Sequence, residues 1–287
     1  MTVPFVSAAD VERRSDAPAA ADALEAALLA GLDPEDDPPR GVVELDRGQL
    51  LVMPSAAGGH PAVKLVTVGG DPRIQGVCVV FDGETLAPAA VIDGIALTNL
   101  RTPAVSALAV RRLAVPDARR LVVFGRGPQA RAHVDAMRAV RPIEHVDMVG
   151  RDHGDVDDLV AAADVICCCT TAREPLFDGA LPADHATVVA IGSHEPDARE
   201  IDDALARRAT VVVESRASAL REAGDVIAAI ASGALAEEDL VTLADLVHAR
   251  AAPAPGRPRL FKSTGMAWED AVVAATFLGN PQARREQ

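Results

Sequence analysis

The residues of this sequence whose spacing best suits ligand binding lie between residues 120 and 151. The short apolar run 121–124 is followed by Gly125, Gly127 and Ala130, and then by a helical pattern and a second apolar run. In this GxGxxA spacing the first glycine permits a tight turn, the second lets the backbone approach a pyrophosphate, and the alanine lets helix and strand pack closely. The first N–H groups of the helix and its positive dipole end favour bound phosphates. We therefore predict a strand–turn–helix–strand unit that binds a nucleotide; the alternative is a tight turn in an α/β protein that binds nothing.

The elements around this turn indicate the fold class. From Ala118 onward, short apolar runs alternate with helical patterns, which predicts a parallel sheet with helices on both faces. The predicted strands are Leu121–Phe124, Val146–Val149, Val165–Cys169, Thr187–Ile191 and Thr210–Val213. The proline-rich residues 251–258 close this region, and a glycine turn then leads into a long apolar helix.

The part of the chain before this region predicts a mixed, sheet-rich structure. The expected elements are a largely helical segment at 7–31, a strand pair over 40–54, a strand over 61–67 and a hairpin over 76–92. A helix follows, with a face of small residues that includes Ala104 and Ala109, and we expect it to begin near Arg101 or Thr102.

Composition and charge exclude several classes of protein. A length of 287 residues is enough for one large domain or two medium ones. The hydrophobic fraction of 49% is unlike that of a disordered chain. The formal net charge of −14 argues against a nucleic-acid partner, because a phosphate backbone would be repelled. No signal peptide opens the chain and no apolar run has the length needed to cross a bilayer, so we expect a cytoplasmic protein with no membrane partner.

The four cysteines predict neither a metal site nor a disulfide. Three of them, Cys167, Cys168 and Cys169, are adjacent, and adjacent residues of a strand point to opposite faces, so they are poorly placed to chelate one ion. Together with Cys78 they are expected to be buried, reduced thiols.

Segments along nearly the whole chain, in the same order, resemble the ornithine cyclodeaminase and mu-crystallin family. They are LLVMP at 50–54, VKLVT at 63–67, DGIALTNLRTPAVSALA, GRGPQARAH, ADVICCCTT, GSHEPDAREID, VESRASALREAGDV and FKSTGMAWEDAVVAA. The resemblance implies an α/β fold with a Rossmann-type NAD(P)-binding domain at 116–265. Beside it, a mixed α+β substrate-binding and dimerisation domain at 1–115 is completed by the C-terminal helix 266–287. The resemblance also implies a small amino or imino acid as substrate, and a homodimer joined through the sheet of the first domain.

Three basic residues match the substrate site that the resemblance implies. Arg40 and Arg101 correspond to the arginines that bind the substrate carboxylate, for which a guanidinium fork is well suited. Lys64 lies in an apolar strand, where an inward-facing lysine would be desolvated, would have a lowered pKa and could hydrogen-bond the carboxylate or move a proton to the imine nitrogen. The alternatives are that Arg40 is a solvated strand residue and that Lys64 lies on the polar face of a half-buried strand.

The cofactor site that the resemblance implies follows the glycine turn and the strand ends. Its residues are Gly125, Gly127, Pro128 and Gln129 at the pyrophosphate, Thr102 at a helix N-terminus, and Thr170, Thr171, Gly192, Ser193, Ser263 and Gly265 at strand ends. Arg151 and Asp152 follow the second strand, where the adenosine ribose is recognised. An acid there favours NAD and an arginine favours the 2′-phosphate of NADP, so both cofactors stay open. Arg151 follows the strand more closely, which slightly favours NADP.

Two departures from the family pattern affect the expected activity. In GSHEPDAREID, His194 stands where the cyclodeaminase branch carries a catalytic aspartate, with Glu195 beside it. A histidine could protonate an imine instead, which weakens ornithine cyclisation as the activity; the alternative is that His194 is a loop residue at a strand end. The segment between Arg151 and Ala163 has room for only one short helix, so we expect a narrower sheet and a less enclosed adenine site.

The residues and the resemblance together predict an NAD(P)-dependent oxidoreductase of amino or imino acids. It would reduce a ketimine such as pyrroline-2-carboxylate or piperideine-2-carboxylate, or catalyse the reverse dehydrogenation. One alternative is an ornithine cyclodeaminase, an ammonia lyase that recycles bound NAD. Others are a non-catalytic NADP or small-ligand binding protein of the mu-crystallin type, and a dehydrogenase that makes a substituted amino acid for a specialised metabolite.

Overall fold

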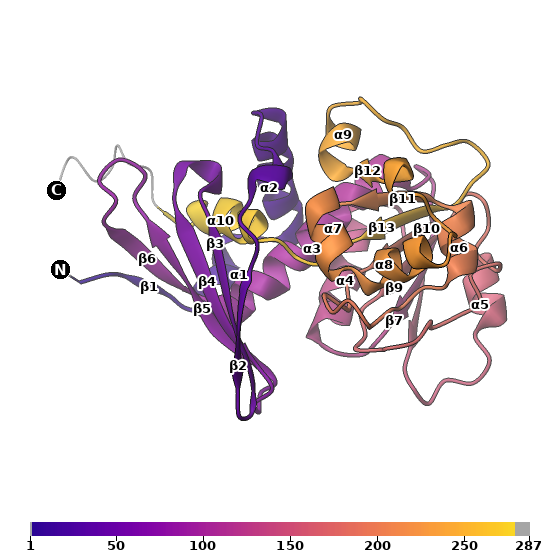
Figure 1. The fold of residues 1–287 in the computed structure, drawn as a ribbon, viewed down its shortest axis with the longest axis horizontal. Coiled ribbons are helices and arrows are strands. Elements are labelled where there is room, and N and C mark those ends of the chain that lie inside the picture. The colour runs from indigo at the N-terminus through magenta and orange to yellow at the C-terminus, as the bar shows by residue number, and fades with distance from the viewer. Residues whose placement is uncertain (1, 279–287) are drawn as a thin grey trace. The chain divides into compact units, whose positions relative to one another are not determined.

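Segments from both ends of the chain build one unit of the structure, and the middle of the chain builds another (Figure 1). The computed structural model describes residues 2–278. Of the described residues, the first unit contains 2–104 and 266–278, and the second unit is Val105–Gly265. This division falls inside helix α3 (Gly94–Leu113), whereas the sequence analysis put the boundary near residue 115, just beyond the end of that helix.

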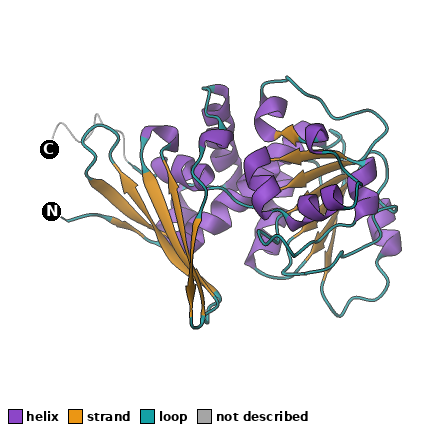
Figure 2. Cartoon of the chain, viewed as in Figure 1, coloured by secondary structure: helices purple, strands orange, loops and turns teal. Residues whose placement is uncertain are grey.

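One sheet organises the first unit (Figure 2). It has six strands, in the order β1-β6-β5-β4-β3-β2. Its strands are β1 (Phe5–Val6), β2 (Gly41–Leu45), β3 (Gly48–Ser55), β4 (Ala62–Val68), β5 (Ile74–Phe81) and β6 (Pro88–Asp93). From β2 to β6 each strand pairs antiparallel with the next, which confirms the predicted strand pair and hairpin. The other elements are α1 (Ala8–Arg14), α2 (Ala17–Leu29), α10 (Ala267–Ala275) and 3-10 turns at Pro34–Asp36 and Ala57–Gly59. Helix α10 packs against α2 and strands β3 to β5.

Burial alternates along β4, and this alternation fixes the direction of Lys64. Ala62, Lys64 and Val66 are buried, while the residues between them are partly exposed. Successive side chains of a strand point to opposite faces, so Lys64 shares the buried face with two apolar residues. The prediction of an inward-facing lysine is confirmed, and the alternative of a surface lysine is wrong.

Helix α3 begins earlier than the sequence analysis expected. The carboxylate of Asp93 accepts hydrogen bonds from two backbone N–H groups of the first turn, which caps the helix at that point. Arg101 and Thr102 therefore lie inside α3, and the prediction that Thr102 stands at a helix N-terminus is wrong. A threonine followed by proline is typical of a helix start, but α3 carries Pro103 in its interior.

A seven-stranded parallel sheet with helices on both faces organises the second unit (Figure 2), and this confirms the predicted α/β, Rossmann-type class. The strand order is β12-β11-β13-β10-β9-β7-β8. The strands are β7 (Arg120–Phe124), β8 (His145–Val149), β9 (Val165–Cys168), β10 (Thr187–Ala190), β11 (Thr210–Val213), β12 (Val241–Thr242) and β13 (Arg259–Lys262). The helices are α4 (Pro128–Val140), α5 (Asp157–Ala162), α6 (Asp203–Arg208), α7 (Arg216–Glu222), α8 (Gly224–Ala231) and α9 (Leu243–Val247), with a 3-10 turn at Glu237–Asp239.

The five predicted strands of this region are present, but the sequence analysis missed β12 and β13. Strand β13 pairs with both β10 and β11, so the missed strand lies within the sheet and not at its edge. Its four residues include Arg259 and Lys262, and two cations in so short a run do not resemble the apolar runs of the other strands. The single short helix predicted after Arg151 is confirmed as α5.

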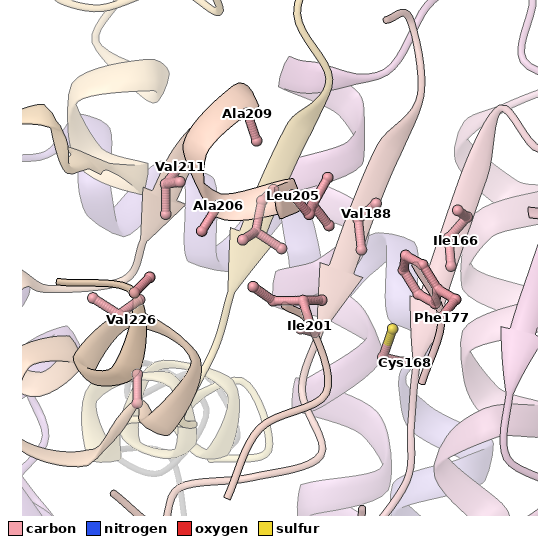
Figure 3. Packing of buried hydrophobic residues seen from close by; sticks show 14 of the residues in the cluster. Ile166, Cys168, Phe177, Val188, Ile201, Leu205, Ala206, Ala209, Val211 and Val226 are labelled. Carbon is pink, nitrogen blue, oxygen red and sulfur yellow. The ribbon is translucent and has the colours of Figure 1, made fainter. Parts of the chain in front are cut away.

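Aliphatic side chains fill the core of the second unit (Figure 3). Ile166 of β9 and Val188 of β10 belong to the same buried cluster as Leu205 of α6. Phe124 and Phe177 stack within this cluster, with their ring centroids 5.4 Å apart. The core thus holds the carboxyl ends of neighbouring parallel strands in register, and the loops that follow them start from fixed points.

Candidate active site

Lys64 is held in a low-dielectric environment on β4. Its side chain is 3% exposed, and its Nζ atom lies 2.7 Å from Asp270 Oδ2 and 3.4 Å from the Thr98 hydroxyl. Burial of the ammonium group, together with the positive charge of Arg101, lowers the pKa of Lys64 to about 8 against the opposing effect of the Asp270 carboxylate. A group with this pKa can donate a proton near neutral pH and accept one slightly above it.

Arg101, on α3, has two carboxylate partners on α10. Its Nη1 donates to Glu269 Oε2 at 2.7 Å, and its Nε donates to Asp270 Oδ1 at 3.2 Å. Asp270 therefore bridges Arg101 and Lys64. These four residues, which we call the Lys64–Arg101 cluster, come from β4, α3 and α10 and contain two cations and two carboxylates, so their charges balance. Carboxylate partners fix the plane of the guanidinium group, which is the requirement for oriented binding of an anionic ligand.

The two carboxylates of the cluster were missed by the sequence analysis. Glu269 and Asp270 are adjacent in AWEDAVVAA, which is otherwise an apolar helix, and each is at most 1% exposed. Acidic residues in an apolar segment are almost never fully buried unless they are paired. Their position was therefore a usable signal for buried cationic partners, although it did not say which ones.

Asp37 fixes the N-terminal end of α10. Its Oδ2 accepts a hydrogen bond of 2.8 Å from the backbone N–H of Trp268, the second residue of that helix. Burial raises the pKa of Asp37. This bond from the loop before β2 helps to hold the acidic pair of α10 in place opposite Lys64 and Arg101.

Arg40 lies at the end of the same loop, directly before β2, and its side chain is partly exposed. The structure brings Lys64 and Arg101 together, because both contact Asp270. The predicted role of Arg40, to bind the substrate carboxylate, stays a prediction.

The turn between β7 and α4 has the features that a pyrophosphate requires. Gly125 has a φ of +115°, and a Cβ atom there would lie 2.5 Å from the Cys169 carbonyl oxygen, so only glycine fits. Gly127 is the N-cap of α4 and has extended backbone that any residue adopts, yet a Cβ atom there would meet no protein atom within 4 Å. No side chain caps α4, and Pro128 occupies its first turn. Open space therefore adjoins uncapped N–H groups, and the phosphates of a dinucleotide fit there.

One of the two residues predicted to recognise the ribose, Asp152, already forms an ion pair within the protein. Asp152 is exposed and forms an ion pair of 2.8 Å with Arg126, a residue of the glycine turn. The hydrogen bond from Arg126 lowers the pKa of Asp152. Arg151 is exposed beside it. The sequence analysis did not single out Arg126, which places a second guanidinium group near this position.

The remaining predicted cofactor residues gather at the carboxyl ends of three strands. Thr170 and Thr171 follow β9, Gly192 and Ser193 follow β10, and Ser263 and Gly265 follow β13. Strands β9, β10 and β13 are neighbours, so these loops lie together at the carboxyl end of the sheet, where parallel α/β sheets bind ligands. His194 continues the loop after β10 and is partly buried.

Glu214 organises the loop after β13 and was also missed. This buried residue follows β11, and its carboxylate accepts hydrogen bonds from the hydroxyl of Ser263 at 2.6 Å and from the N–H groups of Thr264 at 2.9 Å and Gly265 at 3.2 Å. The predicted segment 263–265 is thus held by a charged anchor from the neighbouring strand.

The cysteines are unpaired thiols, as predicted. Cys78, Cys167 and Cys168 are buried and Cys169 is partly buried, and burial raises the pKa of Cys78 to about 12. Among residues 2–278, no three or more His, Cys, Asp or Glu side chains are grouped so that they could hold a metal ion. Over the same residues, no helix combines the length and the apolar character that a membrane span requires.

The fold and the site together define the class of protein. A parallel sheet with an uncapped helix at a glycine turn, and loops from three neighbouring strands at one edge, is a Rossmann-type dinucleotide-binding fold. The first unit adds a separate mixed sheet that carries a buried cluster of lysine, arginine and carboxylates.

The chain belongs to the ornithine cyclodeaminase/mu-crystallin family, whose sequence profile matches residues 2–155 and 153–282. It is 36% identical over 230 residues to the Delta(1)-pyrroline-2-carboxylate reductase of Paracoccus denitrificans, which covers 72% of this chain and 73% of that protein. It is 35% identical over 254 residues to the ketimine reductase mu-crystallin of Mus musculus, with 79% of each chain covered. Among solved structures, the Delta(1)-pyrroline-2-carboxylate reductase of Thermococcus litoralis, in complex with NADH and L-proline, is similar with a TM-score of 0.87, 26% identity and 96% of each chain covered.

Proposed function

We propose that this chain is an NAD(P)-dependent oxidoreductase that reduces a ketimine of an amino acid, such as pyrroline-2-carboxylate or piperideine-2-carboxylate, or catalyses the reverse dehydrogenation. The observation that carries the proposal is the buried Lys64, whose pKa is lowered to about 8 beside Arg101 in the first unit. Relatives that are reductases of pyrroline-2-carboxylate and other ketimines support the substrate class.

In the proposed reaction the residues of the first unit bind the substrate and move its proton. Arg101, held in plane by its carboxylate partners, binds the substrate carboxylate, and Arg40 adds a second guanidinium group. A bound nicotinamide supplies the hydride for reduction and accepts it in the reverse direction. Lys64 is largely an ammonium group at pH 7, so it donates the proton that the substrate nitrogen requires.

The pKa of Lys64 also sets the pH range in which each direction of the reaction is fast. Below pH 8 the ammonium form predominates and reduction is favoured, because that form carries the proton. Above pH 8 the neutral amine predominates and can accept a proton from an amino acid, which favours dehydrogenation. His194 is a further candidate proton donor, from the loop after β10.

The second unit is proposed to bind the cofactor, with NADP slightly favoured. The phosphates would occupy the turn formed by Gly125 and Gly127. Arg126 and Arg151 would meet a 2′-phosphate, and Asp152 is drawn into an ion pair with Arg126 and away from a ribose hydroxyl. The similar structure from Thermococcus litoralis is in complex with NADH, so both cofactors belong in the assay.

The first unit is also proposed to join two copies of the chain as a homodimer. Strand β2 lies at the edge of its sheet, and Val42, Val43 and Leu45 on it are 51%, 48% and 47% exposed. An apolar, unpaired strand edge favours pairing with another chain, and a second copy is the occupant that we propose.

Unpaired cysteine thiols support a reducing, cytoplasmic location.

One set of assays tests the proposal against its alternatives. Oxidation of NADH or NADPH by the purified chain with pyrroline-2-carboxylate or piperideine-2-carboxylate is the expected result. Ammonia release from ornithine without net change of cofactor would instead establish a cyclodeaminase. Tight cofactor binding without turnover of any imino acid would establish a binding protein. A Lys64→Met variant, which keeps an unbranched side chain one atom shorter and removes the ammonium group, should bind cofactor like the wild type and not turn over.

A further inference from the structure

Three of the charged side chains that are buried in the second unit lie close together, and the proposed chemistry uses none of them. The side chains of Lys262 and Asp225 have no exposed surface, and Glu200 is 0% exposed. Lys262 Nζ lies 2.8 Å from Asp225 Oδ2, so one ammonium group faces one carboxylate directly while a second carboxylate lies nearby. Burial of charge is costly unless each group is paired and hydrogen-bonded, so the contacts of the second carboxylate decide its role.

Glu200 joins the loops that follow two neighbouring strands. Its Oε1 accepts hydrogen bonds from the backbone N–H of Thr170 at 2.9 Å and from the hydroxyl of Thr170 at 2.7 Å, and its Oε2 accepts one from the N–H of Gly192 at 2.8 Å. The hydroxyl of Thr170 accepts in turn from the N–H of Ala172. A Cβ atom on Gly192 would lie 2.1 Å from the Thr170 carbonyl oxygen and 2.3 Å from Glu200 Oε1, so this approach requires glycine.

Lys262 and Asp225 hold the same loop from its other side. Lys262 Nζ donates to the backbone carbonyl of Ser193 at 2.9 Å, next to His194. Asp225 Oδ1 accepts from the backbone N–H groups of Glu200 at 2.6 Å and Ile201 at 2.9 Å. The segment from Gly192 to Ile201 is therefore fixed at both ends by buried charges.

The bonds of Glu200 depend on its charge. A carboxylate has lone pairs for all three donors, whereas a carboxylic acid must place its own O–H against one of them. If the proton is on Oε2, it faces the N–H of Gly192 and that bond is lost. Protonation on Oε2 would thus remove the direct bond between Glu200 and the loop after β10.

We propose, on the basis of the function proposed above, that Glu200 is a positioning residue for cofactor binding. While it is ionised, it holds the loop of Gly192 to His194 against Thr170, in the geometry that receives the dinucleotide. Asp225 and Lys262 act together with it. Glu200 acts through these loops and does not itself contact the cofactor. Nothing in the glycine turn or in the Lys64–Arg101 cluster performs this role.

The protonation of Glu200 falls in a physiological range. Burial raises the pKa of Glu200 to about 7, against the lowering effects of Lys262 and of the bonds from Thr170 and Gly192. The groups that face it are Lys262 from β13, Asp225 from α8, and the thiols of Cys167 and Cys168 from β9 and of Cys169 directly after it. Burial raises the pKa of these thiols far enough that they stay neutral. The affinity for the dinucleotide should therefore fall as the pH falls through about 7.

The experiment measures the dissociation constants of NADH and NADPH between pH 5.5 and 8.5 for the wild type, Glu200→Gln and a control. The wild-type affinity should fall at least about tenfold across this range, because one buried bond to a charged group is lost. Glu200→Gln, which imitates the protonated form, should bind about tenfold more weakly at pH 8 and show little pH dependence. The control Glu222→Gln removes a buried carboxylate of α7 that pairs with Arg221, and it should keep the wild-type profile. A flat wild-type profile, or Glu200→Gln with the wild-type profile, would overturn the inference.

Hydrogen exchange of the Gly192 amide tests the same contact without cofactor. In the ligand-free chain the protection factor of this amide, its intrinsic exchange rate divided by its observed rate, should fall as the pH falls below 7. Above pH 7 it should be lower in Glu200→Gln than in the wild type. An unchanged Gly192 amide in the variant would refute the positioning role. If the wild type bound neither cofactor but showed this exchange pattern, the proposed function would fail and the loop anchor would stand.

Discussion

Replacing Asp270 with asparagine should change the pH dependence of catalysis by a predictable amount. Asp270 is the carboxylate that contacts both cations of the cluster, with Oδ2 2.7 Å from Lys64 Nζ. Asparagine keeps the size of the side chain and removes its charge. An opposite charge at such a distance typically displaces a pKa by roughly 1–3 units. The pKa of Lys64 should therefore fall from about 8 to a value between roughly 5 and 7 in Asp270→Asn.

The kinetic consequence follows from the fraction of Lys64 that carries a proton. At pH 7 a lysine with a pKa of about 8 is roughly nine-tenths protonated, and one with a pKa near 6 is roughly one-tenth protonated. We expect ketimine reduction by Asp270→Asn at pH 7 to be about tenfold slower than in the wild type and to recover towards pH 5. The assay is kcat/KM for the ketimine, followed by NADH or NADPH oxidation across the pH range, because this ratio reports the pKa of the ligand-free enzyme.

The matched control is Glu269→Gln. Glu269 pairs with Arg101 and not with Lys64, so this variant should raise KM for the ketimine while the alkaline limb stays near pH 8. Breaking a buried ion pair costs roughly 3–5 kcal/mol, so thermal unfolding must show that both variants are folded at the assay temperature. A folded Asp270→Asn enzyme whose limb stays at pH 8 would refute Lys64 as the proton donor.

Four further predictions concern other parts of the chain. Arg101→Ala should abolish ketimine turnover but leave NADH affinity nearly intact, and unchanged turnover would remove Arg101 from the site. Gly127→Ala should change the free energy of unfolding by less than about 1 kcal/mol and yet weaken cofactor binding, since its Cβ meets no protein atom. Gly125→Ala should instead lower the free energy of unfolding by roughly 1–3 kcal/mol. Equal losses for the two variants in denaturant unfolding would contradict this prediction. His133 is buried, and its pKa is lowered from 6.5 to about 4. Between those pH values the unfolded chain binds a proton that the folded chain does not. The free energy of unfolding should therefore fall by about 3 kcal/mol as the pH falls, relative to His133→Gln. Val43→Asp should convert the proposed homodimer to monomers in analytical ultracentrifugation, and an unchanged sedimentation coefficient would exclude β2 from the interface.

The features that the sequence predicted correctly depend on local pattern. The glycine turn needs only Gly125, Gly127 and the apolar runs beside them, because the turn and the helix start are formed by neighbouring residues. Lys64 was expected to face inward because of its apolar strand and the family resemblance, and β4 places it on the buried face. Local turn chemistry was sufficient for the glycine turn, whereas the inward-facing lysine also needed the resemblance.

The features that were missed depend on contacts between distant segments. Asp270 is far from Lys64 and Arg101 in the sequence, and no short-range pattern says that α10 packs on β4 and not on another element. Strand β13 was missed because its cation Lys262 is acceptable in a buried strand only when Asp225 lies opposite, and that partner comes from another helix. The start of α3 was misplaced because Thr102 precedes a proline that the helix tolerates in its interior.

The charge balance of the Lys64–Arg101 cluster explains why a lysine with a lowered pKa suits the proposed reaction. In the ligand-free chain the two carboxylates of α10 match the two cations. A substrate carboxylate adds a third anion to a buried site, and this excess of negative charge favours the ammonium form of Lys64. Binding therefore secures the proton on Lys64 in the complex that is about to react. Once the proton has passed to the substrate nitrogen, the neutral Lys64 left beside Asp270 is the form that a low pKa makes accessible.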